Sequence, residues 1–384
     1  MAEPRGDVAA PPAAVRVPGT GRLVSLDIFR GITIAGMLLV NNPGTWSAIH
    51  PPLRHAAWHG WTPTDLIFPF FLFIVGVAMV YSFGSHTAEG FDRGRLMRKS
   101  AVRALKLFGL GLFLHLFPNF LDWDTVRIPG VLQRIAIAFL AGAFILLYFR
   151  LKAQVAIAAA LLLGYWMLQT LVPAPGVFPG LLEPGTDLGA AIDRAVLGTS
   201  HLWSQSKTWD PEGLLSTLPA IATVLTGAFV GVWLRSDRSA LEKTVGLFVA
   251  GNVAVVVGLS WGAIFPINKP LWTSSYVLLT SGLACHFLAL CYWLADVRGW
   301  RRWGTPFMWF GMNAIAAFFL SSLGARVMNL IPVGETTLKG WLFNSLYLPL
   351  ASPVNASLLF ALSYVAFWAG VMWLLYRRRI FFKV

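Results

Sequence analysis

Long runs of apolar residues, separated by short polar connections, recur along the whole chain of 384 residues. Each run is at least about 18 residues long, the length at which an α-helix can cross the hydrocarbon core of a bilayer. The runs predict ten such helices, at 24–42, 64–84, 104–121, 130–149, 153–172, 213–234, 244–264, 276–296, 306–330 and 355–376. The pattern therefore predicts an all-α fold, a polytopic membrane bundle of about ten transmembrane helices.

Composition supports a membrane protein without an appreciable soluble domain. Hydrophobic residues make up 57% of the chain and charged residues only 12%, whereas a soluble domain carries about a quarter charged residues. The Pro/Ala/Gly-rich segment 1–22 is predicted to be a disordered tail, and it lacks the apolar stretch of a signal peptide. Residues 23–384 are predicted to form one membrane domain. Cys285 and Cys291 lie in one apolar run and are expected to be packing residues.

The net charge of +13 is distributed unevenly between alternate connections. One set of connections, which includes both termini, holds 21 of the 30 Lys and Arg residues. The other set holds six: Arg54, Arg127, Arg194, Lys207, Lys269 and Lys339. Cytoplasmic loops carry the Lys/Arg excess, so both termini are predicted to be cytoplasmic. The charge is thus a topology signal, not evidence for a nucleic-acid partner, and the expected location is a bacterial inner membrane.

Ionisable residues at membrane depth are costly and mark candidate functional sites. Asp27 and Arg30 share a helical face near the cytoplasmic end of the first span. They form either an ion pair that anchors the helix or a site where Arg30 meets an anionic ligand. Gln133 and Arg134 lie just inside the fourth span, where Arg134 either binds an anion or is paired with Asp122 or Asp124.

A second cluster, His55, His59 and Asp65, is predicted at the outer boundary of the membrane. Histidine is the side chain best suited to move a proton near neutral pH, and a carboxylate can fix its tautomer. The spacing of His55 and His59 is also that of a zinc pair, but the His-Glu-x-x-His pattern is missing and no third ligand is specified. An interfacial structural role for these histidines is the remaining alternative.

Further polar residues lie on the predicted extracytoplasmic rim: Asp210, Glu212, Asn268, Lys269 and Trp272. Asp210 could cap the sixth span, with Glu212 at its positive end. The chain has no Gly-x-Ser-x-Gly elbow, Walker loop, Rossmann glycine set or cysteine metal site. Hydrolases, nucleotide enzymes and zinc proteins that depend on those motifs are therefore excluded.

Seven segments resemble the heparan-α-glucosaminide N-acetyltransferase family, within the wider transmembrane acyltransferase group. They are SLDIFRG (25–31), VNNPG (40–44), RHAAWHGWTPTDLIFPFFLFIVG (54–76), IPGVLQRIA (128–136), WDPEGLLSTLPAI (209–221), INKPLWTSSYV (267–277) and PFMWFGMNAI (306–315). The motifs follow the family order and reach across nearly the whole chain. The long second-span motif is the most specific of them.

The resemblance implies transfer of an acetyl group from cytoplasmic acetyl-CoA to the amine of a glucosamine-type sugar on the extracytoplasmic side. The active histidine of the family falls on His55, its aspartate on Asp65 and its asparagine on Asn41. No metal is implied.

Two groups of binding residues are added to this implied reaction. Arg30, Gln133 and Arg134 are candidates for contact with CoA, while the rim residues Asp210, Glu212, Asn268, Lys269 and Trp272 are candidates for the acceptor. O-acetylation of an envelope glycan and transport of sugars or cell-wall fragments are the rival functions. The sequence leaves open whether the chain forms a homodimer.

Overall fold

The computed structural model describes residues 23–84 and 92–382. The predicted tail 1–22 and the counted charges Arg5, Arg16, Arg22 and Lys383 lie outside the described residues. The helices are α1 (Val24–Asn41), α2 (Ile67–Gly84), α3 (Arg93–Leu116), α4 (Val131–Tyr148), α5 (Leu151–Leu171), α6 (Leu188–Leu197), α7 (Thr217–Arg235), α8 (Ala240–Gly262), α9 (Ser274–Tyr292), α10 (Thr305–Met312), α11 (Ala314–Leu330), α12 (Leu338–Leu342) and α13 (Pro353–Arg377). Strands β1 (Pro332–Val333) and β2 (Thr336–Thr337) form a small antiparallel hairpin.

The expected all-α membrane fold is confirmed. In the part of the chain that the structure describes, eight helices are long and apolar enough to cross a membrane: α1, α2, α4, α5, α7, α8, α9 and α13. Helices α10 and α11 give a ninth span if they are counted together, with a bend of 71° at Asn313. The predicted span 306–330 is therefore broken. Both cysteines are buried and unpaired, as expected for packing residues.

Helix α3 differs from the predicted span 104–121. It begins at Arg93, because the Asp92 side chain accepts a hydrogen bond from the Arg95 amide and caps the helix. It ends at Leu116, ahead of Pro118, a residue that cannot continue a helix. The apolar pattern missed the amino-terminal turns because they are rich in Arg and Lys, and these charges also keep α3 outside the set of apolar spans.

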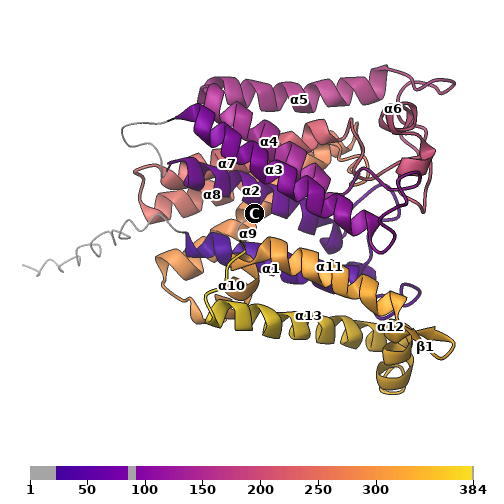
Figure 1. Cartoon of the computed structure of the whole chain (residues 1–384). Helices are drawn as coiled ribbons and strands as arrows, with labels where there is room; N and C mark the ends of the chain where they lie inside the picture. The colour runs from indigo at the N-terminus through magenta and orange to yellow at the C-terminus, as the bar shows by residue number, and fades with distance from the viewer. Residues whose placement is uncertain (1–22, 85–91, 383–384) are drawn as a thin grey trace, which may run out of the picture.

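The helices form two packed groups (Figure 1). In one, α1 packs on α10 and α13, with α11 and α12 beside them. In the other, α2 packs on α7, α3 on α4, and α8 on α9. Helix α1 also contacts α2 and α9, so it joins the two groups.

Glycines allow the closest helix pairs to form, as small residues do in other membrane bundles. A Cβ on Gly227 of α7 would lie 1.9 Å from the carbonyl oxygen of Phe73 in α2. A Cβ on Gly31 of α1 would lie 1.7 Å from the carbonyl oxygen of Phe307 in α10. Any larger residue at these positions would force the helices apart.

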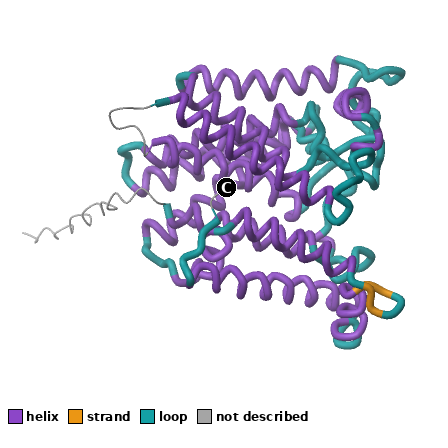
Figure 2. Tube along the Cα trace, in the orientation of Figure 1, coloured by secondary structure: helices purple, strands orange, loops and turns teal. Residues whose placement is uncertain are grey.

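The connections gather at the two ends of the bundle (Figure 2). At one end, Gly60 donates its amide hydrogen to the carbonyl of Ile267, and Ile128 donates to His201. The indole nitrogen of Trp58 also donates to the carbonyl of Leu182, so hydrogen bonds join the segments 43–66, 117–130, 172–216 and 263–273. At the opposite end, Arg235 donates to the carbonyl of Val80. The candidate sites described below lie at these two ends of the bundle.

Candidate active site

His55 and Asp65 contact one another at the end of the bundle where the larger loops gather. Asp65 belongs to a short 3-10 helix (Pro63–Leu66) that leads into α2, and Thr62 caps this helix through a reciprocal capping box. The Oδ1 atom of Asp65 lies 2.6 Å from Nδ1 of His55. The aspartate is 1% exposed, whereas the side chain of His55 is 45% exposed. The imidazole of His55 is therefore accessible to solvent, whereas the carboxylate that it contacts is buried.

The second oxygen of Asp65 fixes the loop that carries His55. Oδ2 accepts hydrogen bonds from the amides of Ala56 and Thr62, both at 3.0 Å. The hydroxyl of Thr62 donates to the carbonyl of Arg54 at 2.6 Å. Because a carboxylate only accepts hydrogen bonds, Nδ1 of His55 carries the hydrogen in this contact. In the neutral ring, Nε2 is then the free basic nitrogen.

Lys269 completes the cluster from the 263–273 connection. Its Nζ atom lies 3.0 Å from Nδ1 of His55 and 3.3 Å from Oδ1 of Asp65. Since Nδ1 already donates to Asp65, the ammonium group of Lys269 can donate only to the carboxylate. Burial lowers the pKa of Lys269, and the negative charge of Asp65 opposes this effect. Lys269, expected to contact the acceptor, thus lies against the His55–Asp65 pair.

Asn268 and Trp272 serve the scaffold of this region. The Asn268 side chain is fully buried and donates to the carbonyl of Trp58 at 3.1 Å, while its oxygen accepts from the Leu271 amide at 2.8 Å. Trp272 is 1% exposed, and its indole nitrogen donates to Thr223. Neither residue is exposed to an acceptor in this structure, although both were candidates for acceptor binding.

Arg127 is the partner of the two rim carboxylates. It donates two hydrogen bonds to Asp210, at 2.8 and 2.6 Å, and one to Glu212 at 2.5 Å. Asp210 was considered as a cap for the sixth predicted span. Helix α7 begins only at Thr217, so Asp210 does not cap it. The guanidinium carries one positive charge against two carboxylates. The positive charges of Arg134 and Lys269 also act on Glu212, so the rim carboxylates are compensated.

Arg134 is completely enclosed by protein. Its Nη1 donates to the carbonyl of Pro211 at 2.9 Å, and its Nη2 donates to the carbonyl of Gly213 at 3.0 Å and to the hydroxyl of Ser216. Its guanidinium also lies over the ring of Trp272 at 5.2 Å. The expected pairing with Asp122 or Asp124 is wrong, because backbone carbonyls take that place.

The remaining predicted residues are dispersed. Gln133 is buried beside His115, with 3.4 Å between Nε2 and Nδ1. Asn41 is the exposed last residue of α1, and no hydrogen bond joins it to His55 or Asp65 among the described residues. His59 lies near Asn268, at 3.3 Å from its amide nitrogen, and not with His55. Within the described part of the chain, no three potential ligands gather around a metal-sized space.

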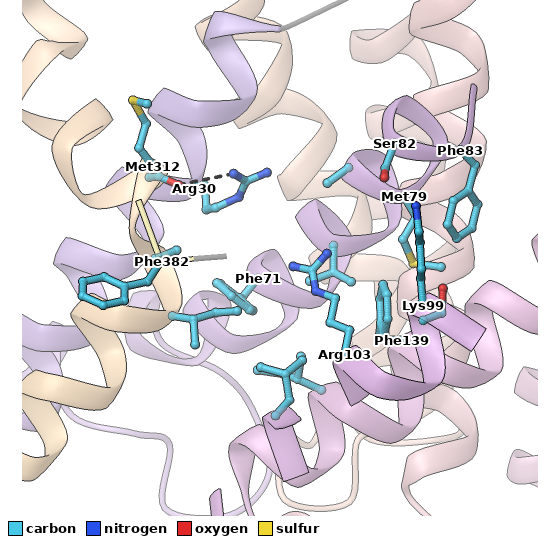
Figure 3. Close-up of a pocket in the computed structure, with 18 of the residues that line it drawn as sticks. Arg30, Phe71, Met79, Ser82, Phe83, Lys99, Arg103, Phe139, Met312 and Phe382 are labelled. Carbon is cyan, nitrogen blue, oxygen red and sulfur yellow. Dashed lines mark hydrogen bonds between the residues drawn. The ribbon is translucent and has the colours of Figure 1, made fainter. Parts of the chain in front are cut away.

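Arg30 is the one predicted CoA contact that lines a large cavity, at the opposite end of the bundle from His55. It donates to Asp27 at 3.2 Å and to the carbonyl of Gly311 at 3.3 Å. The cavity has a volume of about 440 Å³ and lies between the two helix groups. Lys99 and Arg103, from α3, line it as well (Figure 3).

Lys99 and Arg103 were counted in the sequence only as topology charges. Their spacing of four residues places both on one face of α3, together with Leu96 and Leu107, which also line the cavity. Their position on the same helix face as Leu96 and Leu107 was the sequence signal that could have distinguished them from the neighbouring basic residues. In the described part of the chain, neither Lys99 nor Arg103 forms an ion pair. The described lining of the cavity therefore holds three cationic side chains and no carboxylate, although Arg30 is paired with Asp27 beside it.

A second cavity lies at the end of the bundle that carries His55. Its volume is about 940 Å³, and the connections 117–127 and 199–208 form most of its wall. Trp203, on this wall, contacts Trp209 edge-on, and Trp209 contacts Trp58 in the same way. This aromatic row links the cavity to the loop that holds His55.

Similarity to known proteins agrees with the motifs. Residues 22–260 match the family model described as "Heparan-alpha-glucosaminide N-acetyltransferase, catalytic". The protein of that name from Homo sapiens is 31% identical, over 94% of this chain and 60% of the relative. Its Mus musculus counterpart is 29% identical, over 96% of this chain and 61% of the relative. The chain thus spans about three fifths of the length of these curated relatives, and the family model covers more than half of the chain. The chain belongs to the heparan-alpha-glucosaminide N-acetyltransferase family.

Proposed function

We propose that this protein is a membrane N-acetyltransferase that moves an acetyl group from acetyl-CoA on the cytoplasmic side to the amine of a glucosamine-type sugar on the other side. One observation carries the proposal. A proton-accepting His55–Asp65 pair and a cation-lined cavity lie at opposite ends of the same helix bundle. The excess of Lys and Arg in the connections beside the cavity supports a cytoplasmic position for that end, in a bacterial inner membrane.

The cavity suits the nucleotide end of the donor. CoA carries several phosphate charges, and Arg30, Lys99 and Arg103 supply three cations around one space. Arg103 also lies over the ring of Phe139, at 5.0 Å from its centre, which orients the guanidinium. Gln133 and Arg134 do not line this cavity, and we assign them a structural role.

Apolar side chains fill the space between this cavity and the His55 end of the bundle. A smaller cavity shares Phe71, Ile135 and Ile315 with the first one and continues to Met37 and Phe68. Phe68 lies one helical turn from Asp65. The rise along α2 from Ser82 to Asp65 is roughly 26 Å, close to the thickness of the hydrocarbon core. This smaller cavity holds only about 10 Å³, so these apolar side chains would have to move apart for the arm of the donor to carry its thioester toward the far end.

The chemistry assigns one task to each member of the pair. Nε2 of His55 takes a proton from the sugar ammonium, and the freed amine attacks the thioester carbon. The C–N bond forms as the C–S bond breaks, and the CoA thiolate takes the proton from the imidazolium. The imidazole that is regenerated then accepts the second proton from the new amide nitrogen and releases it to solvent. Asp65 holds the ring and stabilises its charged form. Asn41, exposed at the same end, is proposed to donate a hydrogen bond to the oxyanion or the acceptor.

A covalent acetyl-His55 intermediate is the two-step variant of this reaction. In that case Nε2 attacks the thioester first and the amine attacks the acetyl-imidazole second. Protein quenched after mixing with acetyl-CoA alone would contain an acetylated His55 peptide in the two-step route, and an unmodified peptide in the direct route.

The second cavity is proposed to receive the acceptor. Tryptophan edges and polar side chains such as Asn119 and Ser204 provide the apolar and hydrogen-bonding surfaces that a sugar uses. The row from Trp203 through Trp209 to Trp58 would lead the sugar toward His55.

The proposal is tested with purified protein, acetyl-CoA and two acceptors, glucosamine and glucose. We expect release of CoA together with N-acetylglucosamine, and little reaction with glucose, which lacks the amine. Preferential acetylation of hydroxyl groups would instead establish an O-acetyltransferase. Binding of sugar without any turnover of acetyl-CoA would favour a transporter.

A further inference from the structure

The last described residues of the chain form an extended strap, residues 379–382, that turns back after α13. Arg379 has a positive φ of 57°, a backbone conformation that bends the chain sharply. The amide of Ile380 donates to the carbonyl of Leu375 at 2.9 Å, which closes the turn. The strap is thereby directed away from the axis of α13.

Asn313 holds the strap at the break between α10 and α11. Its side chain is 1% exposed. Its Nδ2 donates to the carbonyl of Ile380 at 3.0 Å, and its Oδ1 accepts from the amide of Phe382 at 3.0 Å. The carboxamide thus pairs with the strap as a neighbouring peptide group would. Since an asparagine amide both donates and accepts, few other side chains can replace it here.

The consequence is that Phe382 lines the cationic cavity. Phe382 lies on the same side of that cavity as Met312, and its ring is directed toward the outer edge of the cavity, away from Phe71 and Arg103 (Figure 3). The side chain is 53% exposed, so one face remains open. The ring of Phe381 instead packs near Tyr376, with 6.4 Å between ring centres, and does not line the cavity.

We propose that Phe382 binds the heteroaromatic base of the donor and that Asn313 is the positioning residue that holds it there. Nucleic-acid bases stack on aromatic side chains, and this exposed ring lies at the edge of the cavity that holds the cations proposed for the phosphates. The inference rests on the proposed function. It adds a base contact, made by the end of the chain, to the phosphate contacts of Arg30, Lys99 and Arg103.

Donor truncation provides the test. S-acetylpantetheine keeps the thioester and the arm of acetyl-CoA but lacks the base and the phosphates. Phe382→Ala is expected to raise the KM for acetyl-CoA roughly five- to a hundredfold, the range that corresponds to loss of one base–aromatic contact. The KM for S-acetylpantetheine and both kcat values should stay within about twofold of the unaltered protein. Phe381→Ala is the matched control and should leave the KM for either donor unchanged.

Asn313→Ala should reproduce the donor-specific pattern of Phe382→Ala, because the strap would lose both of its hydrogen bonds. Phe382→Leu keeps an apolar side chain of similar size but removes the aromatic ring. It therefore tests whether stacking on the ring, and not apolar contact alone, contributes to binding of acetyl-CoA. An equal loss with both donors, or an unchanged KM for acetyl-CoA in Phe382→Leu and Phe382→Ala, would overturn the inference. If the unaltered protein turns over neither donor, the proposed function itself fails and the inference falls with it.

Discussion

The proposed reaction depends on one imidazole, whose orientation is set by a buried carboxylate. Asp65 uses one oxygen to fix the loop and the other to hold Nδ1 of His55. The free Nε2 is therefore part of the folded structure and does not have to be arranged when substrate arrives. Lys269 adds a positive charge beside Asp65 and helps to compensate the buried carboxylate.

Replacing His55 by Ala should reduce acetyl transfer by 10²–10⁴-fold, the range typical of a general base, while acetyl-CoA binding is retained. His59→Ala is the matched control, because His59 contacts Asn268 and not the pair. It should lower the rate much less. Transfer rates at equal protein levels measure the effect. Near-normal turnover by His55→Ala would remove this residue from the mechanism.

Replacing Arg103 by Ala should weaken acetyl-CoA binding about ten- to a hundredfold, the equivalent of one charge-assisted hydrogen bond. The same change at Lys106, which lies on α3 but does not line the cavity, should have little effect. Equilibrium binding to purified variants provides the comparison. Equal affinities for the two variants would place the phosphates elsewhere.

Residue types and local spacing predicted His55 and Asp65 as neighbours, because only ten positions and one turn separate them. Contacts between distant segments were beyond local reasoning. Arg127 meets Asp210 across 83 positions, and Arg134 meets backbone carbonyls that carry no side-chain signal. The contact of Lys269 with Asp65 is also long-range, because it depends on how α2 and α9 pack. The sequence therefore suggested only a contact with the acceptor for Lys269.

At the scale of elements, the helices α2 and α7 form one of the closest pairs in the larger group. Gly227 faces the backbone of α2, where a Cβ would lie 1.9 Å from a carbonyl oxygen. A Cβ on Gly164 of α5 would instead point into open space, with no neighbouring atom within 4 Å. The two glycines therefore have opposite roles, although both lie inside apolar spans.

Gly227→Ala should lower the thermal unfolding temperature in detergent, because overpacking at a rigid contact costs about 1–3 kcal/mol. Gly164→Ala should leave this temperature unchanged or raise it slightly, since alanine favours a helix. A Gly227→Ala protein as stable as the Gly164→Ala control would show that the two helices can separate without cost.

Apolar runs located nine of the ten predicted helices to within a few residues, but not their neighbours. Lipid and protein interiors are equally apolar, so a run of Leu, Val and Phe does not reveal which face meets another helix. Helix α3 was the one predicted helix whose bounds were wrong, because its amino-terminal turns are basic and not apolar. The break at Asn313 was also hidden, since the surrounding sequence is uniformly apolar.

At the scale of the whole molecule, the two helix groups enclose a cationic cavity at one end of the bundle, and the His55–Asp65 pair lies at the other end. Alternating charge in the connections predicted which ends of the helices belong together, and the hydrogen bonds between loops match that grouping. The cavity between the groups could not be predicted from the sequence. It forms because α1 packs with α10 and α13, which are more than 250 positions away along the chain.

The central claim is that acetyl transfer proceeds across the membrane through His55. Vesicles that hold the protein in one orientation, with acetyl-CoA on the Arg103 side and glucosamine only on the His55 side, test it directly. The account predicts N-acetylglucosamine on the glucosamine side, CoA on the donor side, and formation of both products about 10²–10⁴-fold more slowly with His55→Ala. Product formed only when donor and acceptor share one side, or formed equally well by His55→Ala, would contradict it.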